Sequence, residues 1–452
     1  MHPLASQVDW PAQERAAIEL FRTLLRFDTT NPPGDEAPCA AFAADYLAEA
    51  GIAPEILEAQ PGRANVVARL RGDGDEPPLM LSAHLDVVPA DADAWTHPPF
   101  AGEIADGYLW GRGAVDMKNM AAMSLWVMAH LARSGARLRR DVIFTGVADE
   151  EAGCGAGSAW LVDEHADKVR AGFALGEVGG FTLHTGGTPV YPVQVAEKGV
   201  CWVRARARGT SGHASMPRDD NAVVRLATFL SRLGRTKLPL QPSAPVERFV
   251  TELAASQGGI AERVLPLLLN PRLSATVSRI ALRDPSVSRM FDAILRNTAS
   301  PVALRGGSKT NVIPSTAEAD IDGRIAVGST ADELLAQLRR LAGPHIDFEV
   351  LLTREPHAAS PDTELFRDIA AVVAEHHPGA VAVPNVIPGF TDAHYWSRLG
   401  TVCYGFSPVR LEADGPGFGD LFHADDERIP VDGFTAGLRM LTDVVCRFTV
   451  AG

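Results

Sequence analysis

The chain has little positive charge for its size and no long apolar run. Its 452 residues include 42 Lys and Arg against 56 Asp and Glu, which gives a formal net charge of −14. Because nucleic-acid binding calls for a basic face, we expect no nucleic-acid partner. No apolar stretch reaches the roughly 18 residues that a membrane-spanning helix needs, so we also expect no membrane association.

Cysteine is scarce, and its spacing argues against a disulfide framework. The number is odd, no C-x-x-C occurs, and the five residues are scattered as Cys39, Cys154, Cys201, Cys403 and Cys446. This pattern is typical of a reducing compartment, where thiols behave as small buried apolar residues. The first residues also lack a charged segment followed by an apolar stretch. We therefore expect no signal peptide and a cytoplasmic protein.

Apolar residues, by contrast, are plentiful: they make up 46% of the chain, and the length fits about two or three domains. Up to residue 193 we expect helices at 11–27, 37–50 and 120–134, and strands at 64–70, 78–82, 141–148 and 171–175. Such alternation predicts a doubly wound α/β sheet.

The pattern changes after residue 193. We expect strands at 195–208, 317–325 and 347–352, and helical segments at 221–233, 243–269, 285–296 and 330–341. These elements predict an inserted α+β domain. The sequence thus suggests one α/β domain made of residues 1–193 and 357–452, with a second domain, residues 194–356, inserted into it.

Histidine and acidic side chains follow the apolar runs at positions where strands would end. His84 and Asp86 come after the run at 78–82, and Glu177 follows the run at 171–175. In open α/β sheets, ligands bind at the carboxyl ends of the strands. These side chains therefore belong to a predicted ligand site.

Acidic residues at two further places in the sequence are predicted to lie at the same edge of the sheet. Glu150 and Glu151 follow the run at 141–148, and Asp116 lies between a glycine-rich turn and the helix expected at 120–134. Imidazole nitrogen and carboxylate oxygen are ligands that zinc takes. The alternative for each residue is ordinary: a hydrogen-bonded loop histidine, a helix N-cap at Asp116, or solvated surface acids. Several such residues in one topological position favour the metal site.

Ordered motifs along nearly the whole chain resemble one known family. The chain is similar to the co-catalytic zinc peptidases that include aminoacylase, acetylornithine deacetylase, succinyl-diaminopimelate desuccinylase and glutamate carboxypeptidase. The motifs are SAHLDVVP, GRGAVDMK, DEEAG, GEVGG, EKG, SGHAS, NVIP and FHADDE. The segments RNTASPVALRGGSKTNVIP, TDAHYW and YGFSPV resemble the carboxypeptidase S-like branch. The family fold would be a doubly wound mixed sheet carrying the metals, with an inserted α+β lid or dimerisation domain.

The resemblance implies two divalent metal ions per chain, with zinc expected first and cobalt or manganese as alternatives. One ion would be held by His84, Asp116 and Glu177. The other would be held by Asp116, Glu151 and His423, so that Asp116 bridges. A lone histidine so far along the chain as His423 carries little weight without this template.

Catalytic roles follow from the same resemblance. Glu150 would be the general base, and Asp86 would fix the ring of His84. His213 would stabilise the oxyanion. The family also suggests a cis peptide between Asp116 and Met117.

The same family assigns the substrate carboxylate to Asn311 and Arg324, and places Thr391 at the substrate. A purely structural role is the alternative for His213, Asn311 and Arg324; Arg324, for example, could pair with Asp320 or Asp322. Many relatives have Gly-Gly-Thr-Asp followed by Arg where this chain has Phe390 and no such Arg. The acyl-group specificity of relatives is therefore not transferred.

We conclude from the sequence that the chain is a metal-dependent hydrolase of the carboxypeptidase or aminoacylase type. Its substrate would be a small peptide or N-acyl amino acid with a free carboxylate, and a homodimer is a candidate assembly. The alternatives are a biosynthetic deacylase, such as acetylornithine deacetylase or succinyl-diaminopimelate desuccinylase, and an inactive binding protein. A nucleotide site at the glycine-rich residues 153–157 is rejected, because the G-x-G-x-x-G spacing is missing.

Overall fold

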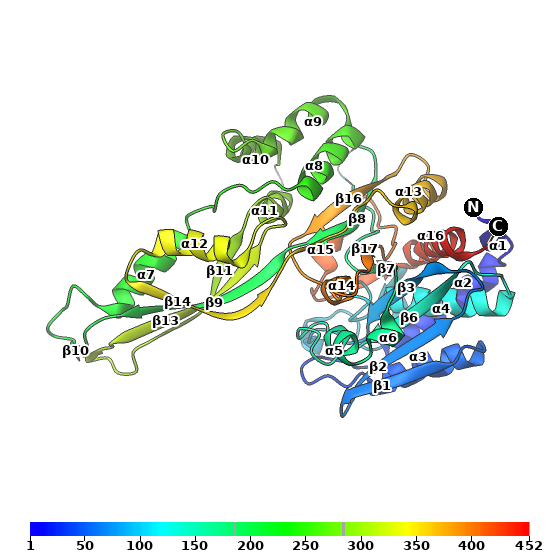
Figure 1. The fold of residues 1–452 in the computed structure, drawn as a ribbon, viewed down its shortest axis with the longest axis horizontal. Helices are drawn as coiled ribbons and strands as arrows, with labels where there is room; N and C mark the ends of the chain where they lie inside the picture. The colour runs from blue at the N-terminus through cyan, green and yellow to red at the C-terminus, as the bar shows by residue number, and fades with distance from the viewer. Residues whose placement is uncertain (185–186, 283–284, 452) are drawn as a thin grey trace. The chain divides into compact units, whose positions relative to one another are not determined.

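A computed structural model describes residues 1–184, 187–282 and 285–451 of the chain. It divides into two compact units (Figure 1). Unit 1 comprises Met1–Val195, Ala359–Asn385 and Thr391–Gly452, and unit 2 comprises Ala196–Ala358 and Val386–Phe390. None of the described helices combines the length and apolar character that crossing a membrane requires.

The larger sheet has nine strands in the order β1-β2-β6-β3-β7-β17-β8-β15, with β16 also paired to β8. The strands are β1 (Pro54–Gln60), β2 (Arg63–Leu70), β3 (Glu76–His84), β6 (Arg140–Val147), β7 (Phe173–Gly176), β8 (Val190–Glu197), β15 (His357–Ala358), β16 (Val381–Ile387) and β17 (Val402–Gly405). The central strands β6, β3, β7 and β17 are parallel, and β1, β2 and β8 pair antiparallel at the flanks. The mixed sheet expected from the sequence is thus confirmed.

Helices cover this sheet on both faces, because its strands are apolar on both. Met80, Ile143 and Ala174 pack against α5 and α14, whereas α4 packs along β3 and β6. The helices of unit 1 are α1 (Pro3–Ser6), α2 (Trp10–Leu25), α3 (Ala37–Glu49), α4 (Lys118–Ser134), α5 (Ser158–Glu164), α6 (Ala166–Val169), α13 (Glu364–His376), α14 (Ala393–Ser397), α15 (Phe418–Leu421) and α16 (Val431–Thr449), besides the short 3₁₀ helix η1 (Ala92–Ala94). The doubly wound architecture is therefore confirmed too.

A small antiparallel sheet in unit 1 was not expected from the sequence. Its strands are β4 (Glu103–Ala105), β5 (Tyr108–Trp110) and β18 (Arg428–Pro430), in the order β18-β5-β4. Trp110 pairs with Arg428 although more than 300 residues separate them. The pairing brings the chain before Asp116 beside the chain after His423.

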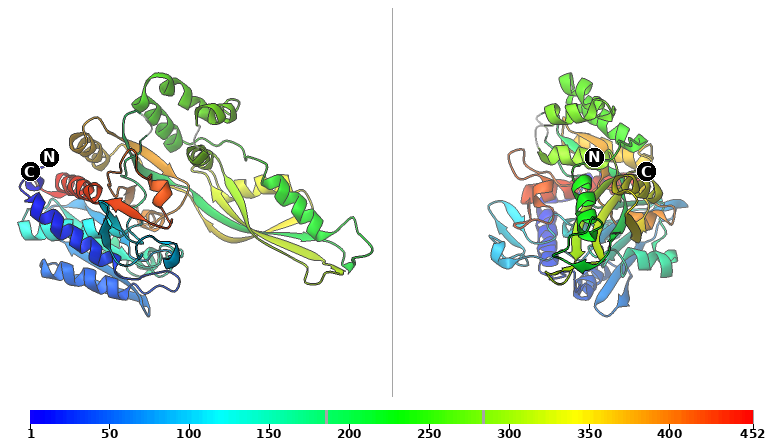
Figure 2. Two further views of the ribbon diagram at one scale, coloured as in Figure 1. Left: turned by 180° about the vertical axis from the view of Figure 1, so that it is seen from behind. Right: turned by 90° about the vertical axis from the view of Figure 1, so that its left-hand side faces the viewer.

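Unit 2 contains a four-stranded antiparallel sheet in the order β11-β13-β9-β14. Its strands are β9 (Gly199–Arg208), β11 (Thr298–Gly306), β13 (Thr316–Ile325) and β14 (Ile346–Arg354), and a separate pair is formed by β10 (Gly212–His213) and β12 (Val312–Ile313). Its helices are α7 (Ala222–Leu233), α8 (Ala244–Gln257), α9 (Gly259–Val264), η2 (Leu265–Leu269), α10 (Ser274–Ala281), α11 (Pro285–Ile294) and α12 (Ala331–Ala342). Helices α7 and α12 bury their apolar sides on one face of the sheet (Figures 1 and 2).

Two expected elements of this region are interrupted. The strand predicted at 195–208 is two strands, β8 and β9, separated at Lys198. A side chain at Gly199 would lie 2.4 Å from the carbonyl oxygen of Arg354, so the chain can change sheets there only with glycine. The helical segment predicted at 243–269 is broken at Gly258 and Gly259, both with positive φ.

Candidate metal centre

Parallel strands of unit 1 deliver the first ligands to one edge of the sheet. Strand β3 ends at His84, β6 ends shortly before Glu150 and Glu151, and β7 ends just before Glu177. Because β3 lies between β6 and β7 and runs parallel to both, their carboxyl ends lie side by side.

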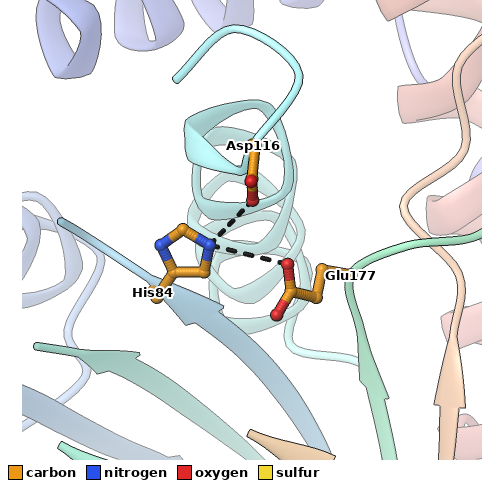
Figure 3. Close-up of side chains that lie close together, drawn as sticks. All are labelled: His84, Asp116 and Glu177. Atoms are coloured by element: carbon orange, nitrogen blue, oxygen red, sulfur yellow. Dashed lines mark hydrogen bonds and ion pairs between the residues drawn. The ribbon is translucent and has the colours of Figure 1, made fainter. Parts of the chain in front are cut away.

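Asp116 lies between two histidines from distant parts of the chain. Its Oδ1 is 2.9 Å from Nε2 of His84, and its Oδ2 is 2.9 Å from Nε2 of His423. Glu177 Oε2 is 3.5 Å from His84 Nε2 (Figure 3), and Glu151 Oε2 is 3.3 Å from His423 Nε2. The ligand atoms form two groups of three that share Asp116, and each group is compact enough for one metal ion.

The donor set fits divalent cations. Both groups combine imidazole and carboxylate, as zinc sites do. Among the described residues, Oε1 of Glu151 and Oε1 of Glu177 are buried without a hydrogen-bond partner. A buried polar atom left unpaired costs about 1–3 kcal/mol. A cation bound at either group would supply the missing partner.

Without a bound cation, burial and the neighbouring side chains raise the pKa values of several groups in this cluster. Burial raises the pKa of Glu177 to about 8, although His84 opposes the shift. Burial and the nearby Glu177 raise the pKa of Glu150 well above its ordinary value. Burial alone would lower the pKa of His423, but its hydrogen bonds to Asp116 and Glu151 raise it to about 10. The cluster therefore takes up protons that a cation would displace.

Asp86 holds the turn that carries Glu150 and Glu151. It is fully buried, and its Oδ1 and Oδ2 accept hydrogen bonds from the backbone N–H groups of Glu150 and Glu151, each at 3.1 Å. Nδ1 of His84 lies 3.0 Å from the carbonyl oxygen of Asp86 and 3.6 Å from its carboxylate. The backbone carbonyl is thus the nearer partner of the ring. Asn31, which the sequence did not single out, donates to Oδ2 of Asp86 at 2.8 Å.

Thr391 lies beside Glu177, one of the candidate metal ligands in unit 1. It is buried and, together with Glu177 and Asp392, lines a small cavity. The carboxylate of Asp392 accepts a hydrogen bond from the hydroxyl of Ser158, and burial raises the pKa of Asp392 to about 6. The sequence analysis assigned no role to Asp392.

His213 and Asn311 lie together in unit 2. His213 is exposed on β10, opposite Val312 of β12, and the N–H of Ala214 donates to the carbonyl oxygen of Asn311 at 3.0 Å. The ring nitrogen Nδ1 of His213 is 2.7 Å from the hydroxyl of Ser215.

Arg324 lies on β13 of the four-stranded sheet, at the end far from the β10–β12 pair. It is opposite Val200 on β9, whereas Thr316, at the β10 end, is opposite Arg208. Eight strand positions correspond to roughly 26 Å, so one chain does not bring Arg324 together with His213 and Asn311. Figure 1 shows β10 beyond one end of β13. The guanidinium of Arg324 donates two hydrogen bonds, of 2.8 and 3.0 Å, to Asp322.

Two ligand groups sharing a carboxylate at the edge of a doubly wound sheet place the protein among metal-dependent hydrolases. The chain belongs to peptidase family M20/M25/M40, whose family model matches residues 80–447. It is 29% identical to a probable carboxypeptidase S-like 2 of Dictyostelium discoideum over 79% of this chain and 69% of that protein. It is 28% identical to aminoacylase-1B of Rattus norvegicus over 96% of each. The fold is similar to an M20 metallo-carboxypeptidase, Sso-CP2, of Sulfolobus solfataricus, with a TM-score of 0.70 and 16% identity over 96% of this chain and 98% of that one. The resemblance expected from the motifs is confirmed, as is the cis peptide between Asp116 and Met117.

The raised pKa values predict how stability changes with pH. The pKa of Glu177 moves from 4.5 to about 8, and that of His423 from 6.5 to about 10. Between pH 6.5 and 8 the folded, metal-free protein therefore holds more protons than the unfolded chain, so its stability falls as pH rises. We expect Tm of the chelator-treated protein to fall more steeply over this interval than Tm of the zinc-loaded protein.

Differential scanning fluorimetry at several pH values would measure both slopes. Lys198, whose pKa burial lowers to about 7, contributes the opposite slope. Its contribution is present in both forms and cancels in the comparison. Equal slopes with and without zinc would show that the cluster does not exchange protons for a cation.

Proposed function

We propose that the protein is a dinuclear metal hydrolase that cleaves the amide bond of a small peptide or N-acyl amino acid with a free carboxylate. The observation that carries this proposal is the shared position of Asp116 between the two ligand groups. A carboxylate with a histidine at each oxygen is suited to bridge two cations. All five cysteines lie in the described part of the chain, where they are buried and form no disulfide, which supports a cytoplasmic location.

In this proposal His84 and Glu177 hold one ion, Glu151 and His423 hold the other, and Asp116 is common to both. Zinc is the first candidate, with cobalt and manganese next. Two such ions would polarise the scissile carbonyl and lower the pKa of water. The chain itself must then supply a base, a group that stabilises the oxyanion, and contacts to the substrate.

Glu150 is the proposed general base. It is 8% exposed, and burial beside Glu177 raises its pKa, so it holds a proton more readily than an exposed glutamate and can return that proton to the leaving nitrogen. The neighbouring Glu151 points its Oε2 to His423 and is proposed as a ligand. Adjacent glutamates thus have separate tasks.

The substrate class is tested by hydrolysis of a panel of dipeptides, N-acyl amino acids, acetylornithine and their C-terminal amides. We expect the zinc- or cobalt-loaded enzyme to cleave free-acid dipeptides or N-acyl amino acids, and a chelator to abolish the activity. Amidated substrates should react poorly. Activity confined to acetylornithine would instead support a biosynthetic deacylase, and full activity after chelation would contradict the metal mechanism.

The division of labour between the two glutamates is tested by paired substitutions. Glu150→Gln keeps the shape and removes the base, so kcat should fall by about 100-fold or more with both ions retained. Glu151→Gln should instead weaken one ion, measured by elemental analysis after dialysis. If the two variants lose metal equally, the proposed roles are wrong.

We further propose that His213, Asn311, Arg324 and Thr391 contact the substrate. Asp86 is proposed to fix the ring of His84. Because Arg324 lies about eight strand positions from the end of β13 nearest His213 and Asn311, one substrate carboxylate cannot meet both ends of the sheet in one chain. Two chains can resolve this conflict, so a homodimer in which His213 and Asn311 serve the partner is favoured.

Mixed dimers test this arrangement. His213→Ala chains co-expressed with Glu150→Gln chains should recover activity, because a hybrid dimer then holds one site with an intact base and an intact partner histidine. With random assembly, recovery should approach about a quarter of the wild-type rate. No recovery from hybrid dimers that are shown to form would mean that His213 acts within its own chain.

A further inference from the structure

A single buried carboxylate connects the two turns that carry Asp116 and His423. Glu427 is fully buried, and its carboxylate accepts hydrogen bonds from the N–H groups of Gly113 at 3.1 Å, Val115 at 2.6 Å and Asp116 at 3.1 Å. A carboxylate surrounded by three backbone donors holds the conformation of that turn. The position of Asp116 therefore depends on Glu427.

Arg112 extends the connection. Its guanidinium, 2% exposed, donates to Oε2 of Glu427 at 2.8 Å, to the carbonyl oxygen of Ala424 at 3.0 Å and to that of Pro89 at 3.3 Å. The carbonyl of Ala424 directly follows His423. Arg112 thus ties the residue after His423 to the turn before Asp116 and neutralises the buried charge.

Backbone hydrogen bonds connect the same two turns. Strands β5 and β18 pair at Trp110 and Arg428, and the N–H of Gly111 donates to the carbonyl oxygen of Glu427 at 3.0 Å. The side chain of His423 is 41% exposed, stacks on Phe422 and contacts Asp116 and Glu151. The backbone that Glu427 and Arg112 hold brings this side chain to Asp116.

We propose that Glu427, with Arg112, is a positioning residue for the metal centre: it sets the spacing between Asp116 and His423 that the second ion requires. This inference rests on the proposed dinuclear function. Residues that orient ligands without touching the metal typically change metal affinity by 10–100-fold. If Glu427 positions the metal ligands, its replacement weakens metal binding in a protein that is still folded. A residue with only a structural role would change stability alone.

The test is metal affinity of Glu427→Gln, measured by competition with a chromophoric chelator at a temperature where the metal-free protein is folded. The amide keeps the size but presents an N–H₂ to backbone donors. We expect the affinity for one of the two ions to fall by roughly 10–100-fold. Wild-type affinity for both ions in this variant would overturn the proposal.

Asp443→Asn is the matched control. Asp443 is likewise a fully buried carboxylate of unit 1, bonded to Arg447 at 3.2 Å, to His376 at 2.9 Å and to the N–H of His2 at 2.6 Å, but to no metal ligand. The Asp443→Asn variant should be less stable than the wild type and keep the wild-type metal affinity. Equal losses of metal affinity in Glu427→Gln and Asp443→Asn would show that Glu427 has only a structural role.

Arg112→Lys covers the case in which Glu427→Gln does not fold. Lysine keeps the charge but cannot span Glu427, Ala424 and Pro89 together. A smaller loss of affinity for the same ion is expected, and unchanged affinity would refute the proposal. Wild-type protein that binds fewer than two ions would instead contradict the dinuclear function itself, so the two failures are distinguishable.

Discussion

The constraint on which unit 1 depends is the packing of several carboxylates with little access to water. Asp116, Glu150 and Glu177 are each less than 9% exposed, and burial raises the pKa of both glutamates. Like charges at such a site repel, and desolvation adds to the cost. The histidines offset part of this cost by contacting Asp116, Glu151 and Glu177. Divalent cations would offset far more, which is the physical reason that the arrangement favours metal binding.

Two kinds of structure assemble the centre. The parallel strands β3, β6 and β7 place His84, Glu150 and Glu177 together because their ends share one edge of the sheet. Asp116 and His423 come from turns outside that sheet, and they meet through the pairing of β5 with β18. The first arrangement follows from sheet topology, whereas the second depends on particular polar contacts.

This difference explains what could be predicted from the sequence. Apolar runs before His84, Glu150 and Glu177 are long enough to indicate strands, so the convergence of these residues followed from topology alone. Strand β18 has three residues, too few for any periodicity, and His423 was therefore found by its motif. Glu427 ends an acidic run that reads as surface charge. Its burial depends on Arg112 and three backbone donors, which no local pattern reveals.

The ion pair of Arg324 with Asp322 is compatible with the substrate contact that we propose for Arg324. Arg324 and Asp322 lie two positions apart on β13 and therefore on the same face. Their side chains are 25% and 30% exposed, and ion pairs open to water typically contribute only about 0–1 kcal/mol. A substrate carboxylate can therefore displace Asp322 at small cost, since the guanidinium recognises the same planar pair of oxygens in either partner.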